Sequence, residues 1–100
     1  METYDNRPIG VFDSGLGGLT VVKCMAEILP NENFVYFGDT ARTPYGSKSI
    51  ETIKSFAAQI TDFLVENGAK IIVIACNTVS ATCLAFLKKR YKGIQIIGMI

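Results

Sequence analysis

Histidine and tryptophan are absent from this 100-residue chain, and cysteine occurs three times without a Cys-x-x-Cys pair. Structural zinc sites draw on several closely spaced cysteines and histidines, so we expect no metal site. An odd number of cysteines at irregular spacing does not indicate a disulfide framework. We therefore expect a reduced, cytoplasmic protein.

Long apolar runs and a charge imbalance are also missing. The longest apolar stretch, Ile71 to Cys76, is far shorter than the roughly 20 residues that span a bilayer, and no signal peptide is visible, so we expect no membrane partner. The 10 basic and 9 acidic residues form no basic stripe, which gives no reason to expect nucleic acid as a partner. The one basic cluster, Lys88 to Arg90, lies near a predicted helix end, where it would complement the helix dipole.

The apolar residues, 49% of the chain, are enough for one small domain over residues 1–100. Short apolar runs predict four strands, at Ile9–Phe12, Phe34–Phe37, Ile71–Ala75 and Ile94–Ile97. The third run is apolar throughout, which is typical of a parallel sheet covered on both faces.

Three helical patterns separate these runs. The first contains Leu19, Val22, Ala26 and Leu29 at helical spacing. The second is a stripe of Ile50, Ile53, Ala57, Ile60 and Leu64, with Gly68 as the natural C-cap. For the third helix we expect Asn77 as the N-cap and an end near Tyr91, before Gly93.

The predicted order, βαβαβαβ, favours an α/β fold with a doubly wound parallel sheet and right-handed crossovers. Ligands of such sheets bind beyond the carboxyl ends of the strands. Three segments should meet at that edge: Asp13–Gly15, the long loop that begins at Gly38, and Cys76–Thr78.

Cys76 is the strongest candidate for chemistry. It follows the most apolar strand and immediately precedes a predicted helix, whose N-terminus stabilises negative charge. A thiolate there could be a nucleophile or a general base, and nearby N–H groups could hold a substrate carboxylate. The alternative is a small apolar residue that closes a strand, and the polar residues Asn77 and Thr78 favour function. We interpret Cys24 and Cys83, which have apolar neighbours inside predicted helices, as buried structural residues.

Two other segments are candidates for the same site. Asp13 and Ser14 precede a glycine-rich turn; they either point into the cleft or serve as turn and N-cap residues. The loop Asp39–Gly46 is long for a connection between strand and helix. Its Pro44-Tyr45-Gly46 turn could present N–H groups to an anion, or these residues could shape the chain, with Tyr45 packed on the surface.

Together, the segments DSGLGGL (residues 13–19), DTARTPYG (39–46) and ACNTVSA (75–81) resemble glutamate racemase, within the aspartate/glutamate racemase superfamily. The resemblance covers essentially the whole chain from Pro8 onward. It implies interconversion of L- and D-glutamate without cofactor or metal, D-glutamate for bacterial peptidoglycan and hence for cell shape, and a full-length homodimer.

The resemblance also implies roles for single residues. Cys76 resembles the thiol that removes the α-proton, and Asp13 the carboxylate that assists it. The residues that resemble those holding the amino acid head group are Ser14, Pro44, Tyr45, Gly46, Asn77 and Thr78. The second catalytic cysteine of the family lies in a Cys-Thr-His segment that this chain lacks, and family members are more than twice as long with two α/β domains. We therefore expect the chain to be the incomplete first domain and to be inactive alone.

Three alternatives stay open from the sequence. An aspartate or other amino acid racemase would share these motifs. A nucleotide-binding domain would explain Gly15-x-Gly17 and Asp39, but Thr20 stands at the third glycine position and Asp13 would repel a pyrophosphate. A module without activity of its own is the third alternative.

Overall fold

The computed structural model describes residues 6–15 and 17–98, so Leu16 of the glycine-rich motif and the chain end at Ile100 lie outside it. Four parallel strands form one sheet in the order β2-β1-β3-β4. The strands are β1 (Ile9–Asp13), β2 (Phe34–Gly38), β3 (Ile71–Ile74) and β4 (Gln95–Gly98). The helices are α1 (Gly18–Ile28), α2 (Ile50–Glu66) and α3 (Asn77–Arg90), with a short 3₁₀ helix, η1, at Thr40–Arg42. The α/β order predicted from the sequence is confirmed.

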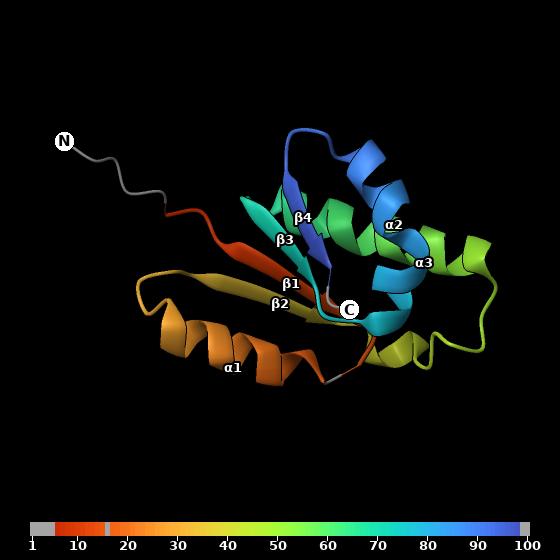
Figure 1. Ribbon diagram of the computed structural model, residues 1–100, viewed down its shortest axis with the longest axis horizontal. Coiled ribbons are helices and arrows are strands. Elements are labelled where there is room, and N and C mark those ends of the chain that lie inside the picture. The colour runs from red at the N-terminus through yellow and green to blue at the C-terminus, as the bar shows by residue number, and fades with distance from the viewer. Residues whose placement is uncertain (1–5, 16, 99–100) are drawn as a thin grey trace.

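Helices cover both faces of the sheet, with α1 on one face and α2 and α3 on the other (Figure 1). The strand order explains this arrangement. The chain moves from β1 outward to β2, and then crosses back past β1 to β3. Because both crossovers favour the right hand, opposite directions of travel place the connecting helices on opposite faces.

The larger core lies between the sheet and the α2–α3 layer. The predicted stripe of α2 is buried at Ile53, Ala57, Ile60 and Leu64, whereas Ile50, at the start of the helix, is half exposed. Helix α3 contributes Val79, Cys83 and Leu87, spaced four residues apart and therefore on one helix face. Helix periodicity thus identified the α2 part of this core, whereas the α3 face was not predicted from the sequence.

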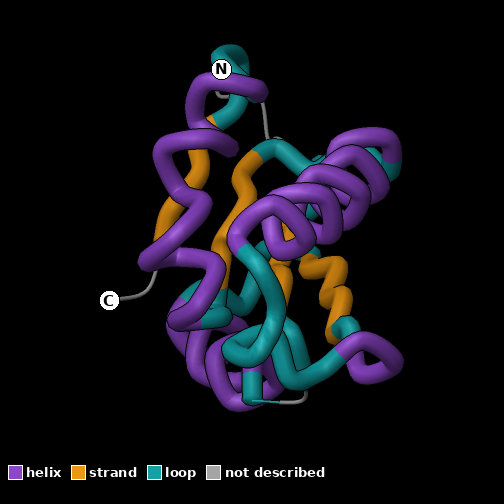
Figure 2. Tube along the Cα trace, turned by 90° about the vertical axis from the view of Figure 1, so that its right-hand side faces the viewer, coloured by secondary structure: helices purple, strands orange, loops and turns teal. Residues whose placement is uncertain are grey.

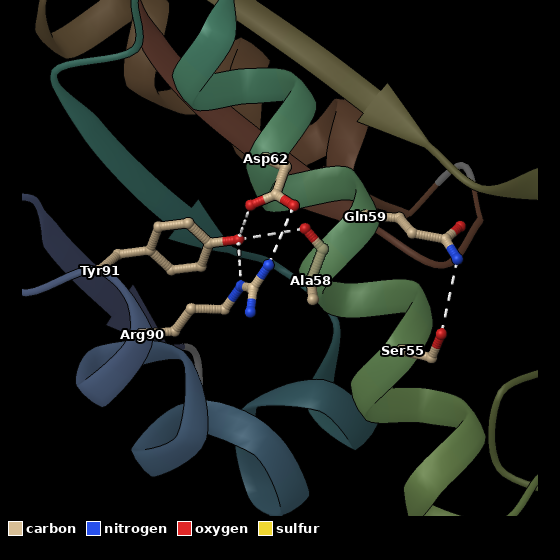
Figure 3. A network of polar contacts seen from close by, with 6 residues as sticks. All are labelled: Ser55, Ala58, Gln59, Asp62, Arg90 and Tyr91. Carbon is tan, nitrogen blue, oxygen red and sulfur yellow. Dashed lines mark hydrogen bonds and ion pairs between the residues drawn. The ribbon is translucent and has the colours of Figure 1, made fainter.

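A polar network fastens the end of α3 to the middle of α2 (Figure 3). The Tyr91 hydroxyl lies within hydrogen-bond distance of the Asp62 carboxylate and of the Ala58 carbonyl oxygen, and it accepts from Arg90 Nε at 3.0 Å. Arg90 also pairs with Asp62 at 3.2 Å. The cluster Lys88–Arg90 occupies the last turn of α3, where it complements the helix dipole as expected.

The start of α3 differs from the prediction. Cys76, with extended backbone angles, is the N-cap, and Asn77 is the first helical residue. The strand pairing explains the difference: Ala75 N–H still donates to Phe12 O, so the chain can turn into the helix only at Cys76. The Cys76 carbonyl then accepts the first helical hydrogen bond, from Ser80 N–H at 3.0 Å. The other predicted strand boundaries agree within one residue.

The face of α1 that packs on the sheet also differs from the sequence pattern. Val22 and Met25 pack against a small cluster formed by Ile9, Val11 and Val73. Leu19 and Leu29, two members of the predicted stripe, are 49% and 42% exposed. Helix α1 is therefore correctly predicted as a helix, but its apolar residues extend well beyond the surface that it buries.

Candidate functional site

The strand order places the topological switch point of the sheet between β1 and β3. Connections leave these two neighbouring strands toward opposite faces of the sheet, and such a switch point is where open α/β sheets bind ligands. Ser14 follows β1 and Cys76 follows β3, so both lie at this point. Figure 2, which views the molecule from the right-hand side of Figure 1, shows loop segments gathered at this end.

Cys76 and Ser14 are in direct contact. The Cys76 thiol donates to Ser14 Oγ across 3.4 Å, and Cys76 is only 5% exposed. No side chain caps the first turn of α3, where Asn77 is exposed and Thr78 half-buried. The first N–H groups of a helix have no partner within the helix. They are therefore suited to hold an anionic group of a ligand next to the thiol.

Asp13 is buried at the end of β1 and turns its carboxylate toward the backbone. Oδ1 accepts from Ser14 N–H at 2.8 Å, and Oδ2 accepts from Gly18 N–H at 2.5 Å. Through these two bonds, Asp13 connects Gly18, the first residue of α1, with Ser14, which contacts Cys76. Since the Asp13 carboxylate already accepts from the first N–H group of α1, that of Gly18, a nucleotide phosphate would have to displace it, which disfavours the nucleotide-binding alternative.

Close packing explains the glycine at the start of α1. A Cβ on Gly18 would lie 2.7 Å from the Tyr36 ring and 2.9 Å from Asp13 Cβ, too close for any other residue without a shift. The Tyr36 hydroxyl donates to Gly15 O at 2.6 Å. Burial, followed by the negative charge of Asp13, raises the pKa of Tyr36, so its hydroxyl keeps its proton for this bond.

The loop after β2 contributes a buried tyrosine rather than a surface one. Tyr45 is 1% exposed, packed edge-on against Phe12 and tilted against Phe56, and its hydroxyl donates to Asp39 Oδ2. The suggestion that Tyr45 packs on the surface is therefore wrong. Pro44, which follows a cis peptide bond, and Gly46 are both exposed on either side of it.

The other two thiols do not join Cys76. Cys83 is fully buried in the core face of α3, as expected, and its sulfur lies 3.3 Å from Thr82 Oγ1. Cys24 is exposed on α1, so the expectation that it is buried was wrong. Its apolar neighbours in the sequence gave no indication that this side of α1 is left uncovered.

The sequence placed Asp39 and Arg42 in a candidate loop, but their pairing was not predicted. Asp39 is buried, and Arg42 Nε donates to its Oδ2 at 2.8 Å. An acidic and a basic residue three positions apart could have suggested this pair. The bond to Tyr45 could not have been found in this way, because it depends on the path of the whole loop.

Two broader observations concern the described residues. Within residues 6–15 and 17–98, no group of three or more cysteine, aspartate or glutamate side chains is placed to hold a metal ion. Across the same ranges, the helices lack the length and apolar character needed to cross a membrane.

Comparison with known proteins gives close relatives over a limited length. No protein-family model matches the chain. The glutamate racemase of Chlorobaculum tepidum is 53% identical over 99 residues, which are 99% of this chain and 36% of the relative. The glutamate racemase of Neisseria meningitidis is 52% identical over 94 residues, covering 94% of this chain and 35% of the relative. The chain thus spans about a third of the length of these curated relatives.

Solved structures give the same result. Glutamate racemase from Francisella tularensis in complex with D-glutamate matches 95% of this chain and 36% of its own, with a TM-score of 0.90 and 56% identity. The Escherichia coli enzyme in complex with L-glutamate and the activator UDP-MurNAc-Ala matches 94% of this chain and 36% of its own, with a TM-score of 0.85 and 32% identity. In sequence and in fold, the chain is therefore related to the glutamate racemases over about a third of their length.

Proposed function

We propose that a full-length enzyme carrying this chain interconverts L- and D-glutamate, with Cys76 as one of two catalytic thiols. The observation that carries this proposal is the contact of Cys76 with Ser14 at the switch point of the sheet, beside the uncapped start of α3. Relatives with about half of their aligned residues identical are glutamate racemases, and two related structures hold D- or L-glutamate, which favours glutamate over aspartate as the substrate.

The proposed reaction transfers one proton away from the α-carbon and another back to it. A thiolate at Cys76 takes the α-proton of one enantiomer, and the electron pair left on carbon spreads into the adjacent carboxylate. A second thiol, outside this chain, donates a proton to the opposite face. The α-proton is weakly acidic, so the base must be close and dry, and fixed dipoles must stabilise the carbanion. The burial of Cys76 and the N–H groups of α3 supply these conditions in part.

The proposed substrate contacts follow the same geometry. The α-carboxylate binds to N–H groups at Asn77 and Thr78, and Ser14 lies beside the thiol at 3.4 Å. The Pro44-Tyr45-Gly46 turn closes the site from the β2 side. Asp13 assists proton transfer at Cys76 and orients Ser14 through its N–H. No cofactor or metal takes part in this scheme.

The resemblance carries three further proposals about the whole protein. It acts in the cytoplasm, it forms a homodimer, and its D-glutamate enters bacterial peptidoglycan and so supports cell-wall formation and cell shape. Neither a membrane nor a nucleic acid is needed for these roles.

The test is Cys76→Ser in the full-length enzyme, assayed by polarimetry from both L- and D-glutamate. We expect turnover to fall at least about a hundredfold in both directions, the lower range of what a general base contributes, with an unchanged circular dichroism spectrum. Cys24→Ser is the matched control, because Cys24 is exposed on α1, and it should keep most activity. Near-normal turnover by a clean Cys76→Ser preparation would exclude the proposed role.

A further inference from the structure

Asp39 joins the loops at the carboxyl end of the sheet. It directly follows β2 and is 5% exposed. Its backbone N–H donates to Asp13 O at 2.9 Å, which extends the pairing of β1 with β2 by one bond. The backbone of Asp39 is therefore fixed relative to Asp13. Asp13 directly precedes Ser14, the residue that contacts Cys76.

Two donors converge on one oxygen of the Asp39 carboxylate. Arg42 Nε donates to Oδ2 at 2.8 Å, and the Tyr45 hydroxyl donates to the same atom. The Arg42 guanidinium is itself held, because it lies 3.9 Å from the centre of the Phe56 ring and donates to Gln59 Oε1 at 2.8 Å. Both Phe56 and Gln59 belong to α2, so the carboxylate connects the loop to the rigid part of the domain.

The buried hydroxyl of Tyr45 has the Asp39 carboxylate as its hydrogen-bond acceptor. The Tyr45 ring packs against Phe12 and Phe56. Without Asp39, the buried hydroxyl would lose the acceptor of its hydrogen bond. Burial, then the bond to Asp39 and the charge of Asp39, raise the pKa of Tyr45 far above its ordinary value, and a Cys76 thiolate adds to the rise while Arg42 opposes it. The hydroxyl is thus protonated and donating at neutral pH.

We propose that Asp39 is a positioning residue, which fixes the Pro44-Tyr45-Gly46 turn through the Tyr45 hydroxyl so that the turn can bind substrate. The proposal rests on the proposed function in one respect, the role of that turn in holding the substrate. A carboxylate that takes part in proton transfer is the alternative. Arg42 argues against that alternative, because its positive charge balances the negative charge of Asp39 and its Nε, like the Tyr45 hydroxyl, already donates to Oδ2.

The kinetic test compares Asp39→Ala, Asp39→Asn and Tyr45→Phe in the full-length enzyme. Asp39→Ala and Tyr45→Phe each break the same contact, so each should raise KM for both enantiomers about tenfold, as expected from losing one hydrogen bond to a charged group. The kcat should change less than about threefold. Asp39→Asn keeps an acceptor oxygen for the hydroxyl and should restore most of the wild-type KM.

A double variant measures directly whether Asp39 and Tyr45 act on KM through the same contact. If Asp39 acts through Tyr45, the double variant Asp39→Ala/Tyr45→Phe should be no worse than either single variant. Glu66→Gln, an exposed acidic residue at the far end of α2, is the control and should leave kcat and KM unchanged. A kcat lost equally in Asp39→Asn and Asp39→Ala would overturn the proposal in favour of proton transfer. An unchanged KM with only a lower melting temperature would overturn it in favour of a purely structural role.

A second measurement does not depend on racemase activity. Tyrosine ionisation, followed by ultraviolet absorbance up to the pH at which the protein unfolds, should leave one resistant hydroxyl protonated in the wild type, and this hydroxyl should be absent from Tyr45→Phe. In Asp39→Asn its transition should move to lower pH, because the neighbouring negative charge is gone. An unmoved transition would overturn the contact itself. If full-length protein fails to racemise glutamate but the transition moves, the proposed function is wrong while the contact stands.

Discussion

At the scale of single residues, the structure shows the structural one of the two tasks that the sequence presented as alternatives for Asp13. Asp13 is the last residue of β1, and both oxygens of its carboxylate accept backbone N–H groups, from Ser14 and Gly18. This structural task holds the backbone of Ser14, whose hydroxyl contacts the Cys76 thiol, so it is compatible with the role in proton transfer that we propose.

Replacing Asp13 should separate catalysis from substrate binding. We expect Asp13→Asn in the full-length enzyme to lower kcat much more than it changes KM, because the carboxylate acts while the proton moves. The amide places N–H groups against backbone donors, so stability should also fall, by about 1–3 kcal/mol for a buried group left unpaired. Steady-state kinetics and urea unfolding measure the two effects. A raised KM with unchanged kcat would mean that Asp13 only binds substrate.

The control for this experiment is Asp62→Asn. Asp62 is also a hydrogen-bonded carboxylate, but it contacts Tyr91 and Arg90, between α2 and the end of α3 (Figure 3). It should lower stability without lowering kcat. If both variants reduce kcat in proportion to their loss of stability, the effect at Asp13 is structural.

The candidate residues show what a sequence can identify at this scale. Cys76 and Ser14 could be predicted to meet, because the ends of parallel strands share one edge and both residues follow strands. The burial of Tyr45 and its bond to Asp39 could not, since they depend on how the loop folds back under Phe12 and Phe56. The exposure of Cys24 was missed because the residues next to it in the sequence do not determine which side of α1 is covered by other elements.

At the scale of elements, α2 ends beside Gly68 as the sequence predicts, but the C-cap itself is Asn67 and not Gly68. Gly68 has a φ of +84° and follows the C-cap residue Asn67. Ala69 N–H donates to Leu64 O at 3.1 Å, and Gly68 N–H donates to Val65 O at 3.0 Å. This pair of bonds is the Schellman motif, which requires a left-handed residue at the position of Gly68.

Gly68→Ala should therefore destabilise the protein by about 1–2 kcal/mol, the cost of a left-handed conformation for a residue with a Cβ. A new Cβ would contact nothing within 4 Å, so the cost is in the backbone alone. Gly93→Ala is the matched control: its surroundings are equally open, but its φ is not positive. Gly93→Ala should be neutral or stabilise the protein by up to about 1 kcal/mol. Urea unfolding measures the stability of both variants. Equal losses of stability in Gly68→Ala and Gly93→Ala would show that the left-handed conformation is not the cause.

Element boundaries were predictable where a special residue marks them and less so elsewhere. Gly68 marks the end of α2 through its conformation. The residue type of Asn77 predicts it as the N-cap of α3, but the backbone turns at Cys76 and no side chain caps the helix. For α1, helical spacing gave the element but not its buried face, since Leu19 and Leu29 remain half exposed.

At the scale of the whole molecule, the two faces of the sheet are covered unequally. Helices α2 and α3 lie together on one face, whereas α1 alone lies on the other, against β1 and β2 (Figure 1). Beside α1 runs an apolar groove of about 430 Å³. Its lining residues are Thr20, Val21, Cys24, Met25, Ile28, Val73 and Ile97. The sequence predicted the parallel sheet, but the strand order that leaves this groove open had to come from the structure.

The arrangement of the three thiols leads to a prediction for the chain by itself. Two-base racemisation needs a proton donor or acceptor on each face of a planar carbanion. Cys83 is fully buried in α3, and Cys24 is exposed on the opposite face of the sheet from α3, so neither can serve the second face beside Cys76. The purified 100-residue chain should therefore show no racemase activity by polarimetry or by coupled detection of D-glutamate, next to a full-length control.

The same experiment needs a check for contaminating host enzyme, because a trace of racemase would mimic activity of the chain. Cys76→Ser made in the identical chain provides it: contaminating activity persists in that variant, whereas turnover by the chain itself disappears. Turnover that depends on Cys76 in the chain alone, even at a small fraction of the full-length rate, would contradict the two-thiol mechanism. It would require one thiol to serve both faces of the carbanion, or water to protonate the face that Cys76 does not reach.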